Sequence, residues 1–591
     1  MLKPQVNRRL PSHCTALTGW RFLGVALALS AHSAMAFEFR NGELTGSFDT
    51  TLSLGAAVRM QERDSALVGI ANGGTARSVN EDNGNLNYDK HDLYAAPVKA
   101  THELELKYQN LGAFLRATYF WDAVNHDKSE LGETGKKRVG RDFEFLDAYA
   151  YGKFALAGKT LNLRLGNQVV SWGESTFIPN GINVINPVNL SKLRTPGAEL
   201  REAFLPTAML WASQELTDTL SVEGFYQANW KKTRIDPKGT YFSSNDFLSD
   251  DGERVYVGFG RRKDERLPAT SAGDAPVWAP RNPDNSPKDT GQYGLAARIF
   301  LPQMNNTEIG LFHINYHSRI PYASGVGGTP SSAAATGTAR YFADYPENIK
   351  LWGVSFNTAG PGGIALQGEY SYRPNLPIQL SAPELLLAAL GAPNTIGQFA
   401  TGETIIGYRR VRAQQLQITA TKAFGPTFGA DDLVTVAEVG YNHLDLPSNQ
   451  RFNGPGVFLP SLQSAAGASS GSIQTDGFAT RQSWGYRLLT RMDFTNLIPS
   501  VTVSPRIAFS HDVDGTGPNF NEGVKAATLG LGFNFKQSWQ ADLAYTSYFG
   551  GRTDSGTDSL ATPAGQSRAY ASSANPLKDR DFIAASLTYS F

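Results

Sequence analysis

The last ten residues, 582–591, alternate apolar and polar side chains with a period of two. Phe591, Tyr589 and Leu587 share one face, and Ser590 and Thr588 share the other. Because successive side chains of a β-strand point to opposite faces, this segment predicts a strand with one apolar and one wet side. A half-buried strand of a soluble sheet would alternate in the same way. A terminal phenylalanine on such a strand is typical of transmembrane β-barrels, which need a lipid-facing side on every strand.

The same alternation recurs along the chain. In 527–535, for example, alanine, leucine and phenylalanine occupy the odd positions, and threonine, glycine and asparagine the even ones. We predict eighteen strands, over residues 43–60, 97–109, 111–123, 142–154, 160–172, 203–216, 219–231, 291–301, 306–318, 349–358, 362–373, 408–424, 432–444, 483–494, 500–512, 522–535, 537–549 and 580–591.

The connections between these strands alternate strictly in length. Those after even-numbered strands are short, such as Asn110 and Lys536, and those after odd-numbered strands are long, such as 173–202 and 232–290. This is the pattern of an up-and-down outer-membrane barrel with short periplasmic turns and long extracellular loops. Since backbone amides in lipid must be paired, the sheet has to close. We therefore predict an all-β fold: one single-chain antiparallel transmembrane barrel of about 18 strands, whose loops fold partly into the lumen.

Residues 1–36 have the features of a cleavable signal peptide. Basic residues precede the apolar run 22–29, and Ala34-Met35-Ala36 forms an A-x-A cleavage site. We expect cleavage near Ala36, an outer-membrane location in a Gram-negative bacterium, and one barrel domain over 37–591. The only cysteine, Cys14, lies within the signal, so the mature chain cannot form a disulfide. The charge is balanced, with 54 basic and 54 acidic residues, and nothing suggests nucleic-acid binding.

With the strands placed, the segment 164–187, which contains Gln168, Trp172 and Asn186, resembles a large Gram-negative outer-membrane family, domain of unknown function 1302. Further matching pieces are 82–88, 368–373, 509–513 and the terminal Tyr589-Ser590-Phe591. The resemblance implies a barrel over essentially the whole mature chain. It supplies no catalytic or ligand-binding residue. Members look like partners of envelope lipid-handling proteins and hydrophobic-compound exporters, so it implies such partners here.

By strand parity, one set of charged and polar side chains should face the lumen. Buried charges are tolerated only when they are paired or wet, so this set should form ion pairs across the barrel or line a polar path. The candidates are Arg116, Arg164, Gln168, Glu223, Glu369, Arg373, Glu438, Arg487, Arg491, Arg506 and Asp542.

Two loop segments are too apolar to remain free in water. Residues 173–206 mix large apolar side chains with asparagines, and 382–390 read as a short, mostly apolar helix that begins near Pro383 and ends before Gly391. We expect both to tuck into the lumen, although they could instead pack against each other and merely cap the barrel. The inward candidates are Trp172, Phe177, Ile182, Asn183, Ile185, Asn186, Leu386 and Leu390.

These features favour a non-enzymatic channel that passes hydrophobic or amphipathic small molecules, with no cofactor. One alternative is an outer-membrane hydrolase acting on lipids, which would need a Ser/His/acid set within hydrogen-bond reach. Seven histidines follow the signal, but neither G-x-S-x-G nor H-E-x-x-H occurs. Another alternative is a structural partner in an envelope lipid-trafficking complex. In every case the partners include outer-membrane lipid and the barrel-assembly machinery, which would recognise the strand ending at Phe591.

Two acidic loop segments offer hard oxygen ligands. Asp512-x-Asp514-Gly515 and Glu81-Asp82-Asn83-x-Asn85 could suit Ca²⁺, but neither has the spacing of a known calcium loop. We interpret both as solvated turn residues and assign no metal site.

Overall fold

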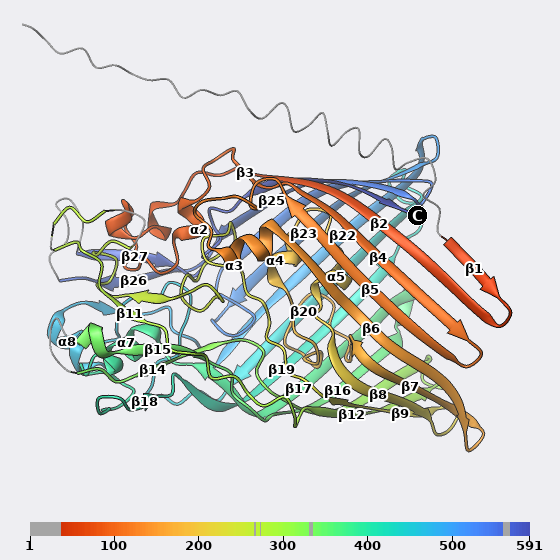
Figure 1. Ribbon diagram of the computed structural model, residues 1–591, viewed down its shortest axis with the longest axis horizontal. Coiled ribbons are helices and arrows are strands. Elements are labelled where there is room, and N and C mark those ends of the chain that lie inside the picture. Colours follow the sequence, from red (N-terminus) through yellow and green to blue (C-terminus); the bar gives the residue numbers. More distant parts are fainter. Residues whose placement is uncertain (1–36, 265–267, 272, 330–334, 560–567) are drawn as a thin grey trace, which may run out of the picture.

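The first and last long strands pair with each other and close the sheet into a barrel. In the computed structural model, which describes residues 37–264, 268–271, 273–329, 335–559 and 568–591, β2 (Leu44–Arg59) runs antiparallel to β28 (Phe582–Ser590). Thr51 is opposite Ser590 and Arg59 is opposite Phe582. Figure 1 shows the resulting barrel with the loops gathered at one end. The predicted signal peptide and its cleavage site lie outside the described residues.

Neighbouring barrel strands are antiparallel and follow chain order. The main sheet has 20 strands, and two of them, β1 (Phe37–Asn41) and β3 (Leu93–Ala95), pair only with β2, which leaves eighteen in the wall. Besides β2 and β28 these are β4 (Pro97–Tyr108), β5 (Leu111–Asp122), β6 (Arg141–Leu156), β7 (Lys159–Gln168), β8 (Thr207–Glu215), β9 (Leu220–Gln227), β12 (Tyr293–Leu301), β13 (Thr307–Tyr316), β16 (Ile349–Ala359), β17 (Ile364–Gln379), β19 (Tyr408–Ala423), β20 (Asp432–Leu444), β22 (Gln482–Ile498), β23 (Val501–Asp514), β24 (Val524–Phe535) and β25 (Trp539–Gly550).

All eighteen predicted strands are confirmed, with two informative differences at their ends. The strand predicted over 160–172 ends at Gln168, and the one predicted over 203–216 begins only at Thr207. The residues between them leave the wall, because the Val170 amide donates to the Asn186 side chain instead of to a neighbouring strand. In the other direction, β17 continues to Gln379 through a bulge after Arg373 and rises beyond its predicted end at residue 373.

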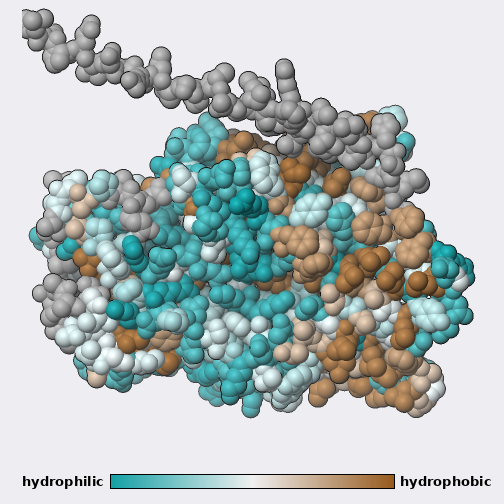
Figure 2. Space-filling model, in the orientation of Figure 1, coloured by the Kyte–Doolittle hydropathy of each residue, from teal (hydrophilic) through white to brown (hydrophobic). Residues whose placement is uncertain are grey.

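An apolar belt surrounds the wall, as lipid requires. In β12, Tyr293 and Leu295 are exposed, whereas the alternating Gly294 and Ala296 are buried. Figure 2 shows apolar side chains gathered over the barrel strands, and a mostly hydrophilic surface over the loop end. No helix among the described residues is long and apolar enough to cross a membrane.

The long loops build a layered cap on the extracellular end. It contains three small sheets, β10 (Arg254–Tyr256) with β11 (Trp278–Pro280), β14 (Tyr322–Val326) with β15 (Arg340–Asp344) and β18 (Thr404–Ile405), and β21 (Ile473–Gln474) with β26 (Thr553–Thr557) and β27 (Ala569–Ser573). Short helices join them, namely α2 (Asn83–Leu86), α3 (Glu133–Gly135), α6 (Ala335–Thr338), α7 (Ala382–Ala389) and α8 (Ala465–Ser470), with 3₁₀ or π turns at 65–67, 70–72 and 136–140.

The predicted helix over 382–390 exists as α7, but the expectation that it enters the lumen is wrong. It packs against β14 and β18 in the cap, where Leu385 contacts Tyr341 and other apolar residues of the loops. Leu386 and Leu390 are half-buried there. Its apolar face is covered by β14 and β18 of other loops, whereas the alternative left open by the sequence was packing against residues 173–206.

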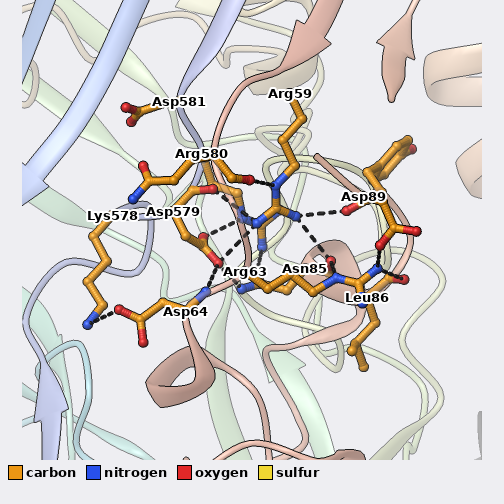
Figure 3. A network of polar contacts seen from close by, with 12 residues as sticks. Arg59, Arg63, Asp64, Asn85, Leu86, Asp89, Lys578, Asp579, Arg580 and Asp581 are labelled. Atoms are coloured by element: carbon orange, nitrogen blue, oxygen red, sulfur yellow. Dashed lines mark hydrogen bonds and ion pairs between the residues drawn. The ribbon is translucent and has the colours of Figure 1, made fainter. Parts of the chain in front are cut away.

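A buried ionic network stabilises the extracellular end of the seam, which is the junction where β2 pairs with β28 (Figure 3). Arg59, at the end of β2, donates to the Asp579 carboxylate at 3.1 Å and to the carbonyl of Tyr88 at 2.9 Å. Asn85 of α2 donates to the same carboxylate at 2.6 Å, and Arg580 contacts both Asn85 and the carbonyl of Tyr241. The first, fourth and last external loops are thus tied together where the barrel closes.

Candidate functional site: a loop across the lumen

Residues 169–206, which we call the lumen loop, leave the wall after β7 and return to it at β8. Asn186 fastens the two ends together. Its side-chain oxygen accepts from the Val170 amide at 2.9 Å, and its nitrogen donates to the carbonyls of Gln168 and Leu205 at 3.0 and 3.1 Å. The segment carries two short helices, α4 (Leu190–Leu193) and α5 (Leu200–Ala203), which lie inside the ring of strands in Figure 1.

The first half of the lumen loop is held by two wall carboxylates that accept from its backbone. Glu438 of β20 accepts from the amides of Thr176, Phe177 and Ile178 at 3.0, 2.6 and 2.8 Å. Glu369 of β17 accepts from the Ile182 amide at 2.7 Å and from the Glu174 amide. Both carboxylates are buried, at 1% and 2% exposure, because the loop covers them.

Arg373 of β17 completes this attachment from the donor side. Its guanidinium donates to the carbonyls of Asn180 and Gly181, at 2.7 and 2.5 Å, and to the Tyr316 hydroxyl at 3.1 Å. Three polar side chains that parity directs into the lumen, Glu369, Arg373 and Glu438, therefore hold one loop rather than one another.

An apolar cluster packs the base of the loop against the wall. Trp172, Ile182 and Ile185 are at most 1% exposed and contact Phe225 and Phe312. The Trp172 indole donates to Glu223 at 2.8 Å, so its polar edge is satisfied as well.

Wall glycines make room for this packing. A methyl group on Gly353 would lie 2.7 Å from the Cγ1 of Ile182, and one on Gly440 would lie 2.8 Å from the Cδ1 of Ile178. Because they lack a side chain, these two inward-facing glycines leave the space that Ile182 and Ile178 of the loop occupy.

The second half of the lumen loop crosses to strands on the opposite side of the seam. Lys192 donates to Glu144 of β6 at 2.9 Å. Glu202 of α5 forms an ion pair with Lys99 of β4 and accepts from the Thr101 hydroxyl at 2.8 Å. The sequence analysis missed Lys99, Glu144 and Glu202, although Lys99 lies on the lumen-facing side of its strand, where an isolated charge is a detectable signal.

The remaining lumen candidates brace the wall. Arg116 pairs with Glu103 and Asp147 at 2.8 and 2.6 Å. Arg506 of β23 pairs with Asp542 of β25, across the intervening strand β24. The others form similar contacts: Arg487 with Asp512 at 2.7 Å, Arg491 with Asp493 at 2.9 Å, Glu223 with Arg298 at 2.8 Å, Gln168 with the Met209 carbonyl at 3.0 Å, and Arg164 over the Tyr149 and Trp211 rings.

A cavity of about 750 Å³ lies between the lumen loop and the extracellular ends of β13, β16, β17, β19 and β20. Four large apolar side chains on its lining are exposed: Phe177 at 40%, Leu193 at 44%, Leu200 at 65% and Ile320 at 47%. Asn183, which also lines it, donates to the Ser171 hydroxyl at 2.9 Å. A cavity of this size and lining is typical of small-molecule sites.

Two buried arginines, Arg319 and Arg373, line the same cavity. Both donate only to neutral oxygens, and neither forms an ion pair within the described residues. Arg319 follows β13, outside the membrane-spanning strands, and burial lowers its pKa to about 9. It therefore remains cationic at neutral pH, and the described residues that line the cavity include two arginines and no acidic side chain.

The histidines form no hydrolase-like set in the part of the chain that the structure describes. The hydroxyl nearest to a histidine nitrogen is that of Thr50, whose Oγ1 lies 2.9 Å from the Nδ1 of His102. The other ring nitrogen of His102 faces the Tyr119 hydroxyl at 3.4 Å, so no acid completes the arrangement. His317 contacts the backbone of Thr290 and Asn348. No group of three histidine, acidic or cysteine side chains among the described residues could hold a metal.

Comparison with known proteins identifies a family. No curated protein matches the chain. Solved structures that resemble it include Acinetobacter baumannii OccAB4, at 10% identity and a TM-score of 0.40 over 92% of this chain and 98% of that one. Acinetobacter baumannii OccAB1 gives 9% and 0.41 over 95% and 99%, and the outer membrane protein OpdK of Pseudomonas aeruginosa gives 9% and 0.39 over 92% and 98%. The model of the family described as "Protein of unknown function (DUF1302)" matches residues 18–591, and the chain belongs to this family.

Proposed function

We propose that the protein is an outer-membrane channel for hydrophobic or amphipathic small molecules, which cross it by binding and diffusion. One observation carries this proposal: Phe177, Leu193, Leu200 and Ile320 expose apolar surface inside a lumen whose wall is otherwise polar. Exposed apolar surface of this extent marks a binding site.

The charge distribution favours an amphipathic solute over a purely apolar one. Arg319 and Arg373 place two cationic groups beside the apolar lining, while Glu369 and Glu438 turn their oxygens toward the lumen loop backbone. An acyl or aromatic body would contact Leu200 and Phe177, and an anionic head group would be attracted toward the arginines.

The proposal includes no chemical step and assigns no catalytic residue. β28, which ends at Ser590 beside Phe591, is the segment that we expect the barrel-assembly machinery to recognise. We propose envelope lipid-handling proteins and hydrophobic-compound exporters as partners that would deliver or remove the solute.

The test is a flux assay in proteoliposomes with a dansyl-labelled alkyl sulfonate, which carries a permanent charge and crosses lipid slowly. Leu200→Asp places a charge in the cavity and removes an apolar contact worth about 1.5 kcal/mol, so we expect at least about tenfold slower flux. Leu462→Asp is the matched control, because Leu462 is 57% exposed on the cap and does not line the cavity. Equal flux through the two variants would refute the apolar path.

The same vesicles distinguish a polar porin. If arabinose enters them rapidly while the sulfonate neither binds to nor crosses the protein, the lumen is a water-filled pore and the proposed solute class is wrong.

A further inference from the structure

A groove of about 720 Å³ crosses the outer face of the wall from β8 to β17. It follows two adjacent rows of paired residues, of which one consists of Ala212, Gly224, Leu295, His313, Trp352 and Tyr372. Leu295 and Trp352 are 62% and 53% exposed, so these rows face lipid and not the lumen. The groove is therefore separate from the lumen cavity, and what fills it does not depend on the proposed function.

The groove slopes from the extracellular side of the wall toward the periplasmic side. The row of residues meets β17 at Tyr372, eight residues from the periplasmic end of that strand at Ile364. It meets β8 at Ala212, only three residues from the periplasmic end at Glu215. Six strands at a spacing of about 4.8 Å give the groove a length of about 24 Å. An acyl chain that spans one leaflet of a hydrocarbon core about 30 Å thick therefore fits along it.

Small side chains create the depression. Ala212 and Gly224 are paired on β8 and β9, and Ala297 pairs with Leu311 across β12 and β13. The three small residues line the groove next to the larger Leu311 and Trp352. A void here would forfeit dispersion contacts, and water would find few polar partners on this lining. Hydrocarbon must therefore fill the depression.

Aromatic and basic side chains lie at the extracellular end of the groove. The ring centroids of His313 and Trp352 are 4.0 Å apart, and those of Tyr293 and His313 are 6.2 Å apart. Such rings are enriched where hydrocarbon meets lipid head groups. Lys350 is exposed on the same face of β16 as Trp352, two residues nearer the cap. It therefore lies at the level of the head groups.

Arg410 of β19 lies beside Lys350 at this level. Its guanidinium donates to the carbonyls of Glu347 and Asn375, at 2.7 and 3.4 Å. The Lys350 amide donates to the Asn375 side chain at 2.9 Å, so both basic residues contact Asn375. Lys288 is a third exposed basic residue here, and its amide donates to the Glu347 carboxylate at 2.9 Å.

The charges of these basic side chains are not neutralised by the protein. Lys288, Lys350 and Arg410 form no ion pair in the part of the chain that the structure describes. By contrast, Arg412, two residues farther along β19, pairs with Asp445 at 2.6 Å. Basic residues near a membrane surface attract anionic lipids. Unpaired cations at the end of an apolar groove match the two parts of such a lipid.

We propose that the groove and the basic residues at its extracellular end bind one phosphorylated glycolipid of the outer leaflet. An acyl chain lies along the groove against Leu295 and Ala297, and a phosphate group lies at Lys350 and Arg410. The head group is on the extracellular side, so the lipid belongs to the outer leaflet, which in a Gram-negative outer membrane consists of such glycolipids. The planar guanidinium of Arg410 and the compact ammonium of Lys350 both suit phosphate.

The test is native mass spectrometry of the delipidated barrel in detergent, titrated with diphosphoryl lipid A or with phosphatidylethanolamine. We expect the wild type to retain one lipid A and to prefer it to phosphatidylethanolamine. The double variant Lys350→Gln/Arg410→Gln should bind lipid A about 25-fold more weakly, at about fivefold for each basic residue. Ala297→Phe fills the groove but keeps both charges. It should weaken binding at least about threefold, because the displaced chain loses close contacts with the wall.

The matched control is Lys525→Gln/Ala527→Phe, which makes the same two kinds of change on the outer face of β24, away from the groove. Heat-resistant mobility on SDS gels verifies that each variant is folded. The proposal is overturned if the wild type does not prefer lipid A, if the control weakens binding as much as the double variant, or if inorganic phosphate alone binds as tightly as lipid A. A dimeric barrel that Ala297→Phe converts into monomers would also overturn it, because a second copy would then fill the groove.

Discussion

Replacing Glu438 by alanine should release the first half of the lumen loop without unfolding the barrel. The carboxylate accepts three backbone hydrogen bonds, from Thr176, Phe177 and Ile178, at 2.6–3.0 Å. A hydrogen bond to a charged group contributes about 1.5–3 kcal/mol. We count the bond to buried Ile178 in full and the other two at about half, since their residues are exposed and water can replace the carboxylate. The sum is about 3–6 kcal/mol.

Local opening of the segment 174–182 should therefore become about 10² to 10⁴ times more frequent, at 1.4 kcal/mol per tenfold change. The assay is amide hydrogen exchange read by mass spectrometry, with conductance in planar bilayers as a second readout. Protection should fall over 174–182 in Glu438→Ala, and conductance should rise. Glu438→Gln keeps one acceptor oxygen and should lie between the alanine variant and the wild type.

The control for this experiment is Asp542→Asn, which breaks a wall ion pair with Arg506 but does not touch the lumen loop. It should leave exchange over 174–182 unchanged. If protection of this segment is the same in Glu438→Ala as in the wild type, the carboxylate does not hold the loop and the reasoning is refuted. If Asp542→Asn loosens the segment equally, the effect reflects general weakening of the wall.

Three further changes test the packing and the seam. Gly353→Leu should displace Ile182 from the space that this glycine leaves, at a cost of about 1–3 kcal/mol, seen as a lower thermal unfolding midpoint in detergent; an unchanged midpoint would mean that the loop does not pack there. Arg59→Met removes one of the two buried arginines that pair with the Asp579 carboxylate, the other being Arg580, and should cost about 1.5–3 kcal/mol, so the barrel should lose its heat-resistant mobility on SDS gels at a lower temperature. Deleting residues 37–41 removes β1 from the edge of β2 and should speed unfolding at the seam, whereas unaltered unfolding kinetics would show that this edge needs no cover.

The wall of the barrel could be predicted from the sequence because the signals for its strands and turns lie within short stretches of the chain. Alternation with a period of two marks each strand, and positive-φ turn residues such as Lys536 and Gln537 fix the tight hairpins between them. Parity also indicates that Glu369 and Glu438 face inward. Parity does not give the position of these two residues along the barrel axis. That position determines that their carboxylates accept from the amides of Ile182 and Ile178 instead of pairing with an arginine of the wall. The match depends on the strand stagger, which no single strand encodes.

The packing of the loops in the cap could not be predicted, for a related reason. The helix α7 is apolar enough to need cover, but the sequence does not say whether the lumen or a neighbouring loop provides it. Leu385 finds that cover against Tyr341, some forty residues earlier in the chain. The segment 81–85 looks like a polar turn, yet Asp246 and Arg580, which are distant in sequence, bury it. Long-range contacts of this kind are visible only once the loops are assembled.

The attachment of the lumen loop also determines what a solute would meet. In a polar lumen, inward carboxylates such as Glu369 and Glu438 would be free to bind cations or sugars. Here backbone amides occupy them, and the loop that they hold turns Phe177 and Leu200 toward the cavity. The acids on the wall thus support an apolar surface instead of forming a polar one. Among the described residues that line the cavity, Arg319 and Arg373 are the charged ones, whereas Glu369 and Glu438 lie behind the loop backbone that they hold. Under the proposed function, the preference for an apolar body with an anionic end depends on how the loop is attached, and it should weaken together with that attachment.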